Sequence, residues 1–155
     1  MFNNILVPTD GSKLSQKAVQ EAIQLAKLTG AKLVVLHVYP KFSGSPYGMP
    51  SEFGPSRFGP SEDVIAEAHT RQHKAEAERL FAAIKKIAGA AGVALETALV
   101  ESDDIYKQII AVAKKNKCDL ICMASHGRRG LSGVVLGSET HKVLTHSAIP
   151  VLVLR

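Results

Sequence analysis

The chain has 155 residues, of which 46% are hydrophobic and 21% charged, and its formal net charge at pH 7 is +5. This length fits one domain and suffices to bury roughly 68–70% of the unfolded surface. No apolar run approaches the roughly 18 residues of a membrane-spanning helix, and the amino terminus lacks a basic-then-apolar leader pattern. We therefore expect a single cytoplasmic domain that makes no contact with a membrane.

The positive charge gathers in the last third of the chain, where residues 105–155 carry eight Lys or Arg against two Asp or Glu. Such an excess favours an anionic ligand. The composition argues against nucleic acid as that ligand, because the chain has no basic run interleaved with aromatics and only 5% aromatic residues. A small anion fits the pattern better.

Two cysteines, Cys118 and Cys122, are too few for a disulfide framework. Being four residues apart across the start of an expected strand, they should point to the same face, about 13 Å apart and too far to bridge. We expect Cys122 to act as a small buried hydrophobic residue.

The first elements follow from short apolar runs and their stop signals. Residues 4–8 predict a strand that a proline ends, and residues 9–12 predict a turn. A helix should then run to about Thr29, where Gly30 stops it. Residues 32–38 are almost continuously apolar, which is typical of a central parallel strand that is buried on both faces.

Residues 39–60 contain five prolines and four glycines without any periodicity, and they predict a long mobile loop. Its aromatic residues either cover a site or a partner surface or only pack locally, and the sequence leaves both readings open. They are Phe42, Tyr47, Phe53 and Phe58.

A long helix is expected over residues 61–91, with Ser61 as its N-cap. His69 and His73 lie four residues apart on it and could share a metal. The metalloprotease pattern H-E-x-x-H fails, however, because a threonine follows His69. We interpret the pair as part of a solvated helix face.

The remaining elements complete an alternating pattern. Residues 94–100 predict a strand, Ser102 or Asp103 begins a helix through Asn116, and residues 120–124 predict a buried strand. A further helix and a closing strand at 150–154 follow. Five strands that alternate with four helices, without hairpin signals, predict an α/β domain with a parallel sheet and right-handed crossovers.

The segment after residues 120–124 combines glycines with the pair Arg128-Arg129, and Ser138 should N-cap the next helix. A glycine-rich loop before a helix presents backbone N–H groups and the positive end of a dipole, which favours phosphate. A plain turn is the alternative. A Walker loop and the dinucleotide fingerprint are excluded by the spacing. The glycines are Gly127, Gly130, Gly133 and Gly137.

The residues Ala124-Ser125-His126-Gly127, followed by nine residues and then Gly137-Ser138, are similar to the ATP-loop signature of the universal stress protein family. That signature reads glycine, two residues, glycine, nine residues, glycine, then serine or threonine. Residues 5–12, 36–38 and 149–153 fit the family too, so the resemblance covers nearly the whole chain. Ala124 departs from it, because it stands where the signature has its first glycine.

This resemblance implies an open parallel five-stranded sheet in the order 3-2-1-4-5, with helices on both faces. It also implies that ATP binds where the winding reverses, with Mg²⁺ held by the phosphates and no metal ligand from the protein. The residues that it implies for the nucleotide site are Pro8, Thr9, Asp10, Val38, Met123, Ala124, Ser125, His126, Gly127, Arg128, Gly130, Gly137, Ser138, Glu139 and Thr140. The earlier ones in this set would hold the adenosine and the later ones the phosphates.

We expect a nucleotide-dependent regulator in a stress response, with an unknown regulatory protein as partner. An ATPase would use Asp10 for Mg²⁺ and His126 as acid or base, but no carboxylate cluster accompanies the loop. A nucleotide-free dimeric scaffold is a third class, which Ala124 keeps open. The family also implies a homodimer through residues 150–154, an apolar segment expected at the sheet edge.

Overall fold

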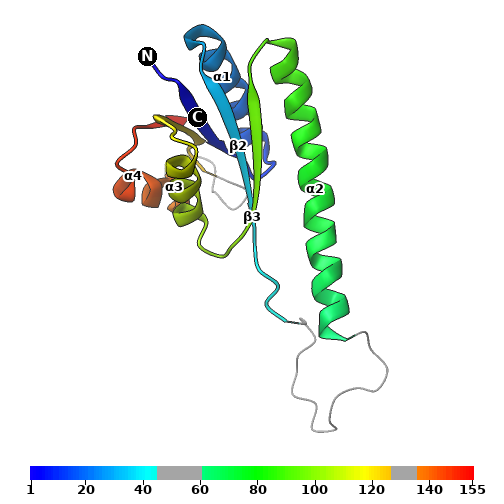
Figure 1. Ribbon diagram of the computed structural model, residues 1–155. Helices are drawn as coiled ribbons and strands as arrows, with labels where there is room; N and C mark the ends of the chain where they lie inside the picture. Colours follow the sequence, from blue (N-terminus) through cyan, green and yellow to red (C-terminus); the bar gives the residue numbers. More distant parts are fainter. Residues whose placement is uncertain (45–60, 127–135) are drawn as a thin grey trace.

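The apolar runs of the sequence lie side by side as one parallel sheet in the computed structural model, which describes residues 1–44, 61–126 and 136–155 (Figure 1). The strand order is β3-β2-β1-β4-β5, and every neighbouring pair is parallel. The predicted fold class and strand order are therefore confirmed. The strands are β1 (Asn4–Pro8), β2 (Lys32–Tyr39), β3 (Leu95–Glu101), β4 (Leu120–Ala124) and β5 (Val151–Leu154).

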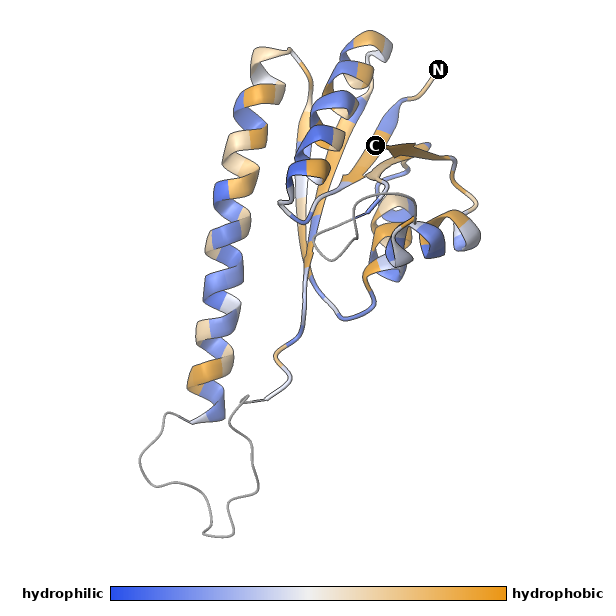
Figure 2. Ribbon diagram, turned by 180° about the vertical axis from the view of Figure 1, so that it is seen from behind, coloured by the Kyte–Doolittle hydropathy of each residue, from blue (hydrophilic) through white to orange (hydrophobic). Residues whose placement is uncertain are grey.

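Four helices in the described residues cover the two faces of this sheet. Helices α1 and α2 pack on one face and α3 and α4 on the other (Figure 1). Figure 2 shows the strands as the hydrophobic centre of the molecule, with helices of mixed hydropathy around them. The helices are α1 (Lys13–Thr29), α2 (Glu62–Ala90), α3 (Ile105–Lys115) and α4 (Ser138–His146).

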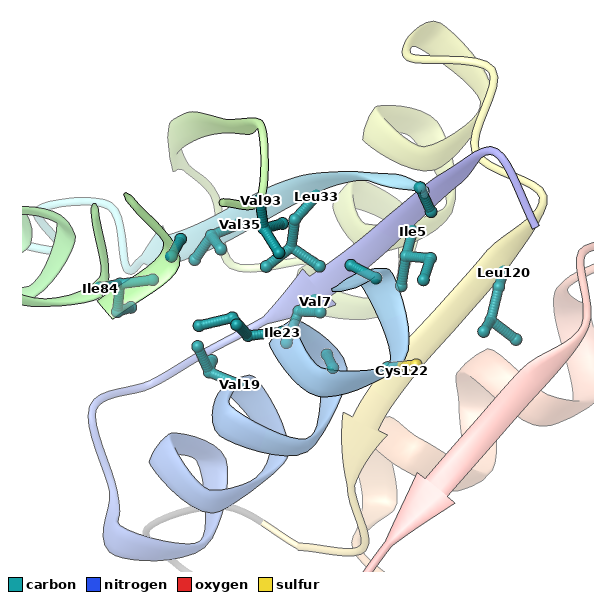
Figure 3. Packing of buried hydrophobic residues seen from close by; sticks show 14 of the residues in the cluster. Ile5, Val7, Val19, Ile23, Leu33, Val35, Ile84, Val93, Leu120 and Cys122 are labelled. Atoms are coloured by element: carbon teal, nitrogen blue, oxygen red, sulfur yellow. The ribbon is translucent and has the colours of Figure 1, made fainter. Parts of the chain in front are cut away.

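Alternation along β1 divides the core into two clusters. Ile5 and Val7 point to the layer of α1 and α2, whereas Leu6 points to the layer of α3 and α4. Figure 3 shows the first cluster, in which Val19 and Ile23 of α1 lie against the strands. All of these side chains are almost completely buried, as expected for a sheet that is covered on both sides.

The ends of α1 follow the sequence. The Ser12 hydroxyl accepts a hydrogen bond from the Ser15 N–H (3.2 Å) and so caps the first turn. Gly30 ends the helix with φ of 72°, a left-handed conformation that glycine adopts without strain.

The start of the predicted loop needs correction. Tyr39 belongs to β2 and is buried, because its ring stacks on that of His73 with 5.1 Å between centroids. The ring of His69 lies tilted against that of Phe42, with 5.7 Å between centroids, and both histidines are half-buried. The interpretation of the two histidines as a solvated face is therefore wrong. Ser61 precedes α2, but its side chain makes no capping hydrogen bond. The rest of the predicted loop, residues 45–60, lies outside the described residues.

Both cysteines are buried and unbridged, but they lie on opposite sides of the sheet. The prediction of a shared face is wrong because Cys118 precedes β4 and does not follow its alternation. Cys122 packs in the cluster of α1, as a small hydrophobic residue should. Burial raises the pKa of the Cys122 thiol to about 12 and that of Cys118 to about 11, so both thiols stay protonated at neutral pH.

Asp119 joins the amino ends of β1 and β4. Its carboxylate accepts hydrogen bonds from the backbone N–H groups of Asn3 (2.8 Å) and Asn4 (3.1 Å) and from the Asn3 side-chain amide (3.0 Å). Partial removal from water raises the pKa of Asp119, but these hydrogen bonds outweigh that effect and lower the pKa below its ordinary value.

A carboxyl group whose pKa is lowered by folding stabilises the native state above its unfolded pKa and loses this effect as the pH falls through the folded pKa. Asp119→Ala should therefore lower the free energy of unfolding by about 1 kcal/mol at pH 7, a value discounted for exposure to solvent. The deficit relative to the wild type should vanish below the folded pKa. Urea unfolding at several pH values measures this. An equal loss in Glu21→Ala, an exposed acid of α1, or a deficit that is independent of pH would contradict the assignment.

Candidate functional site

The candidate site lies where the direction of winding reverses. Strand β1 has β2 on one side and β4 on the other. The chain leaves β1 for α1 on one face of the sheet, whereas the helix that follows β4 packs on the opposite face. The carboxyl ends of β1 and β4 therefore lie together at the end of the sheet where open parallel sheets bind their ligands. We call this carboxyl end of β1 and β4 the ligand edge.

The turn after β1 is tightly hydrogen-bonded. Thr9 is buried, its N–H donates to the carbonyl of Leu36 (2.8 Å), and its hydroxyl lies 3.0 Å from that of Ser15. Asp10 accepts a hydrogen bond from the Ser12 N–H (2.9 Å), which makes the Asx turn that its residue type favours. The segment from Pro8 to Asp10 thus reaches the ligand edge in a fixed conformation.

His37 also belongs to this edge, and the sequence analysis did not include it among the site residues. Its Nδ1 lies 2.7 Å from the carbonyl oxygen of Thr9. Because a carbonyl can only accept, Nδ1 must carry the proton and donate it. The signal was a histidine within an otherwise apolar strand, directly before Val38. Val38 itself is partly buried against the cluster of α3 and α4.

The end of β4 is buried and contributes mainly backbone. Met123 packs in the cluster of α3 and α4, and Ala124 and Ser125 are also buried. Ala124 lies within the strand, so its methyl group replaces the first signature glycine at a regular strand position. The Ser125 hydroxyl lies 3.2 Å from Nδ1 of His126, which is the last described residue before the gap.

The start of α4 is held directly against the end of β4. The N–H of Gly137 donates to the carbonyl of Ser125 (2.7 Å), and the Thr140 hydroxyl donates to the carbonyl of Ala124 (3.0 Å). Gly137 occupies the N-cap position and Ser138 is the first helical residue, so the prediction of Ser138 as the cap is wrong by one residue. The chain that enters α4 therefore passes beside the chain that leaves β4.

A lack of space for a side chain explains the glycine at position 137. A Cβ on Gly137 would lie 3.0 Å from Cα of His126 and 3.1 Å from the carbonyl oxygen of Ser125, which are both backbone atoms. The φ of Gly137 is −60°, a value open to any residue, so glycine is needed here for close approach and not for its conformational freedom.

This arrangement presents the amino end of α4 at the ligand edge. The first N–H groups of a helix have no acceptor within the helix, and the dipole gives them a partial positive charge. An anion can accept from them. The predicted site residues Gly127, Arg128 and Gly130 lie outside the described residues. Those that are described come from β1, β2, β4 and α4 and sit at the ends of these elements.

Glu139 is turned away from this end of α4. Its carboxylate accepts a hydrogen bond from the backbone N–H of Tyr106 in α3 (2.9 Å) and lies 2.7 Å from Nζ of Lys142. Among the residues that the structure describes, no group of three or more His, Cys, Asp or Glu could hold a metal ion. No helix within the described ranges is both long and apolar enough to cross a membrane.

A hollow of about 720 Å³ lies elsewhere, between Phe42, the first half of α2 and Glu101. It is wide open, and its lining mixes acidic side chains with Arg71 and Lys74. We place the site at the edge between β1 and β4 instead, because backbone donors and the reversal of winding converge there.

The fold and this end of the sheet together define an α/β protein with an open parallel sheet and the amino end of a helix at its switch point. The universal stress protein family model matches residues 1–155, and the chain belongs to this family. It is 34% identical to the universal stress protein YxiE of Bacillus subtilis over 155 residues, with all of both chains covered. It is 32% identical to the universal stress protein MJ0531 of Methanocaldococcus jannaschii, covering all of this chain and 83% of that one.

Solved structures share the fold. Universal stress protein UspA from Lactobacillus plantarum superposes with a TM-score of 0.80 at 26% identity, over 99% of this chain and 97% of that one. A universal stress protein in complex with cAMP has a TM-score of 0.68 at 22% identity, over 99% and 97%. One from Archaeoglobus fulgidus in complex with dAMP has a TM-score of 0.62 at 19% identity, over 99% and 98%.

Gly137→Val should force the start of α4 away from the end of β4 and lower the free energy of unfolding by about 1–3 kcal/mol, the usual cost of overpacking. Gly89→Ala is the matched control, because a Cβ there meets nothing within 4 Å and the residue is helical. The control should be stabilised by about 0.5–1 kcal/mol. Denaturant unfolding of both variants measures this. Equal stability of Gly137→Val and the wild type would show that the contact is not tight.

Proposed function

We propose that this protein binds ATP at the edge between β1 and β4, with the phosphates at the amino end of α4. The observation that carries the proposal is the 2.7 Å hydrogen bond from Gly137 to Ser125, which brings the helix end beside the end of β4. A phosphate there would accept from the free N–H groups of the first helical turn. The excess of positive charge in residues 105–155 favours the same ligand.

The adenosine would lie on the side of β1 and β2. The carboxylate of Asp10 would bond its polar groups, and Val38 would contact the apolar part of the base. His37 supports this wall, because its hydrogen bond to the Thr9 carbonyl fixes the backbone directly before Asp10. Proteins of this fold have been solved with the adenine nucleotides cAMP and dAMP, which supports an adenine nucleotide as ligand.

The phosphates would lie on the side of β4 and α4. Ser138 would add its hydroxyl to the backbone donors of the helix end, and Ser125 and His126 would border the sugar. Gly127, Arg128 and Gly130 belong to the proposed site through the family resemblance. The Thr140 hydroxyl already donates to Ala124, so its part is to hold the helix in place. Mg²⁺ would arrive with the nucleotide and be held by the phosphates.

We propose a regulator in the stress response, not a dedicated enzyme, located in the cytoplasm and acting through a protein partner. Fast phosphoryl transfer needs acidic groups that hold metal ions and orient a nucleophile. Of the acidic side chains in the described residues near the edge, Asp10 is part of an Asx turn and Glu139 is bonded to α3. A protein that hydrolyses its bound ATP slowly keeps one nucleotide state for a long time, which suits a switch.

Isothermal titration calorimetry with MgATP tests the binding. The wild type should bind, and Asp10→Ala should bind about tenfold more weakly, a change of about 1.4 kcal/mol. The control Glu96→Ala removes an exposed acid near the amino end of β3, away from the proposed site, and should bind MgATP as the wild type does.

Hydrolysis of ATP by the wild type should stay far below the roughly 1–100 s⁻¹ of kinases. A folded wild type that binds no nucleotide would favour the dimeric scaffold, and fast turnover that depends on Asp10 would favour the enzyme.

We also propose a homodimer through β5. This strand lies at the edge of the sheet, and Leu152 on it is 40% exposed although it is apolar. An edge strand with an exposed apolar side chain is a template for pairing with a second chain. Two copies that pair along β5 would bury this side chain and continue the sheet.

Leu152→Lys should shift the protein from dimer to monomer in sedimentation velocity, because a charge would be buried in the interface. Leu28→Lys is the control. It introduces the same charge at an exposed leucine of α1 (83% exposed) and should leave the dimer intact. A dimer that persists in Leu152→Lys would exclude this strand as the interface.

A further inference from the structure

Glu139 connects the two helices that cover one face of the sheet. It is the second residue of α4, and one of its carboxylate oxygens accepts a hydrogen bond from the backbone N–H of Tyr106 at 2.9 Å. Its other oxygen lies 2.7 Å from Nζ of Lys142, one turn further along α4. The two residues of the hydrogen bond are 33 positions apart in the sequence, and Figure 1 shows α3 and α4 side by side.

The first turn of helix α3 receives this acceptor from outside the helix. Asp104 occupies the N-cap position but makes no capping hydrogen bond, and its carboxylate lies 3.0 Å from Nζ of Lys107. The N–H of Tyr106 belongs to the first turn, where no acceptor exists within the helix. Glu139 therefore supplies from α4 both the missing acceptor and a negative charge at the positive end of α3.

The same contact determines where the charge of Glu139 lies. A carboxylate in the first turn of α4 would repel a phosphate bound at that helix end if it pointed there. Instead it points to α3 and is paired with Lys142, whose Nζ also lies 5.5 Å from the centre of the Tyr106 ring. The Glu139 side chain is 30% exposed, so this ion pair is partly shielded from water.

Three contacts then fix the first turn of α4. Gly137 and Thr140 tie it to the end of β4, and Glu139 ties it to α3. The first two hold the start of the helix beside the end of β4, and the third holds it beside α3.

We propose that Glu139 is a positioning residue for the nucleotide site: by capping α3 it holds the amino end of α4 in the orientation that receives the phosphates. This inference rests on the proposed ATP binding. It assigns Glu139 no contact with the nucleotide or its metal, although the family resemblance includes this residue in the nucleotide site. Loss of the contact should weaken binding without removing any group that touches the ligand.

Two substitutions at Glu139 separate its possible roles. Glu139→Ala removes the acceptor and should weaken MgATP binding about fivefold, which corresponds to the loss of a helix cap of about 1 kcal/mol. Glu139→Gln keeps an oxygen that can accept from the Tyr106 N–H and should bind within about twofold of the wild type. Lys107→Ala is the control, because it breaks an i,i+3 ion pair of the same kind on α3. It should bind as the wild type does.

Hydrogen exchange of the Tyr106 amide, measured by NMR in the nucleotide-free protein, tests its hydrogen bond to Glu139 without any ligand. Exchange should be about tenfold faster in Glu139→Ala and close to the wild-type rate in Glu139→Gln, because opening of this amide depends on the acceptor. Faster exchange together with the fivefold weaker binding, and rescue of both by glutamine, is the expected result.

The other outcomes overturn the assignment in distinguishable ways. If exchange changes but Glu139→Ala binds MgATP as tightly as the wild type, the contact is structural only. If alanine and glutamine both weaken binding and the loss disappears without Mg²⁺, Glu139 is a metal ligand. If both tighten binding, its charge repels the phosphates. If the wild type itself binds no nucleotide, the proposed function fails and this role fails with it.

Discussion

The contact between the end of β4 and the start of α4 is the constraint on which the site depends. A 2.7 Å hydrogen bond joins Gly137 to Ser125, and a Cβ on Gly137 would press on backbone atoms at 3.0 and 3.1 Å. Because both neighbours are backbone, neither can rotate away. A side chain at this position would have to displace that backbone by a few tenths of an ångström, so glycine favours the close approach of α4 to β4. This approach brings a helix end to the edge where the winding reverses.

The two ends of the sheet differ in how their polar groups are used. At the amino end the groups satisfy one another, since Asp119 accepts from Asn3 and Asn4 and joins β1 to β4. At the carboxyl end the turn after β1 is fixed by Thr9, Asp10 and His37, while the first N–H groups of α4 have no acceptor in their own helix. One end holds the strands together, and the other offers donors to a ligand.

Local patterns predicted the elements well, because apolar runs and stop residues act within a few positions. The strand order came from the family resemblance. Contacts between distant segments were not predictable. Tyr39 extends β2 because it pairs with Glu101 of β3. Gly137 takes the N-cap position expected for Ser138, where its N–H is bonded to the carbonyl of Ser125. Glu139 faces Tyr106 rather than the helix end. Each of these depends on a partner more than ten residues away in the sequence.

The proposed binding of the ATP phosphates at the amino end of α4 can be tested by titrating the isotope-labelled protein with MgATP and following its amide NMR shifts. We expect the largest shifts at Ser138 to Thr140, with a second group at Thr9 and Asp10. Shifts that gather instead around the hollow between Phe42 and Arg71, with α4 unchanged, would contradict it.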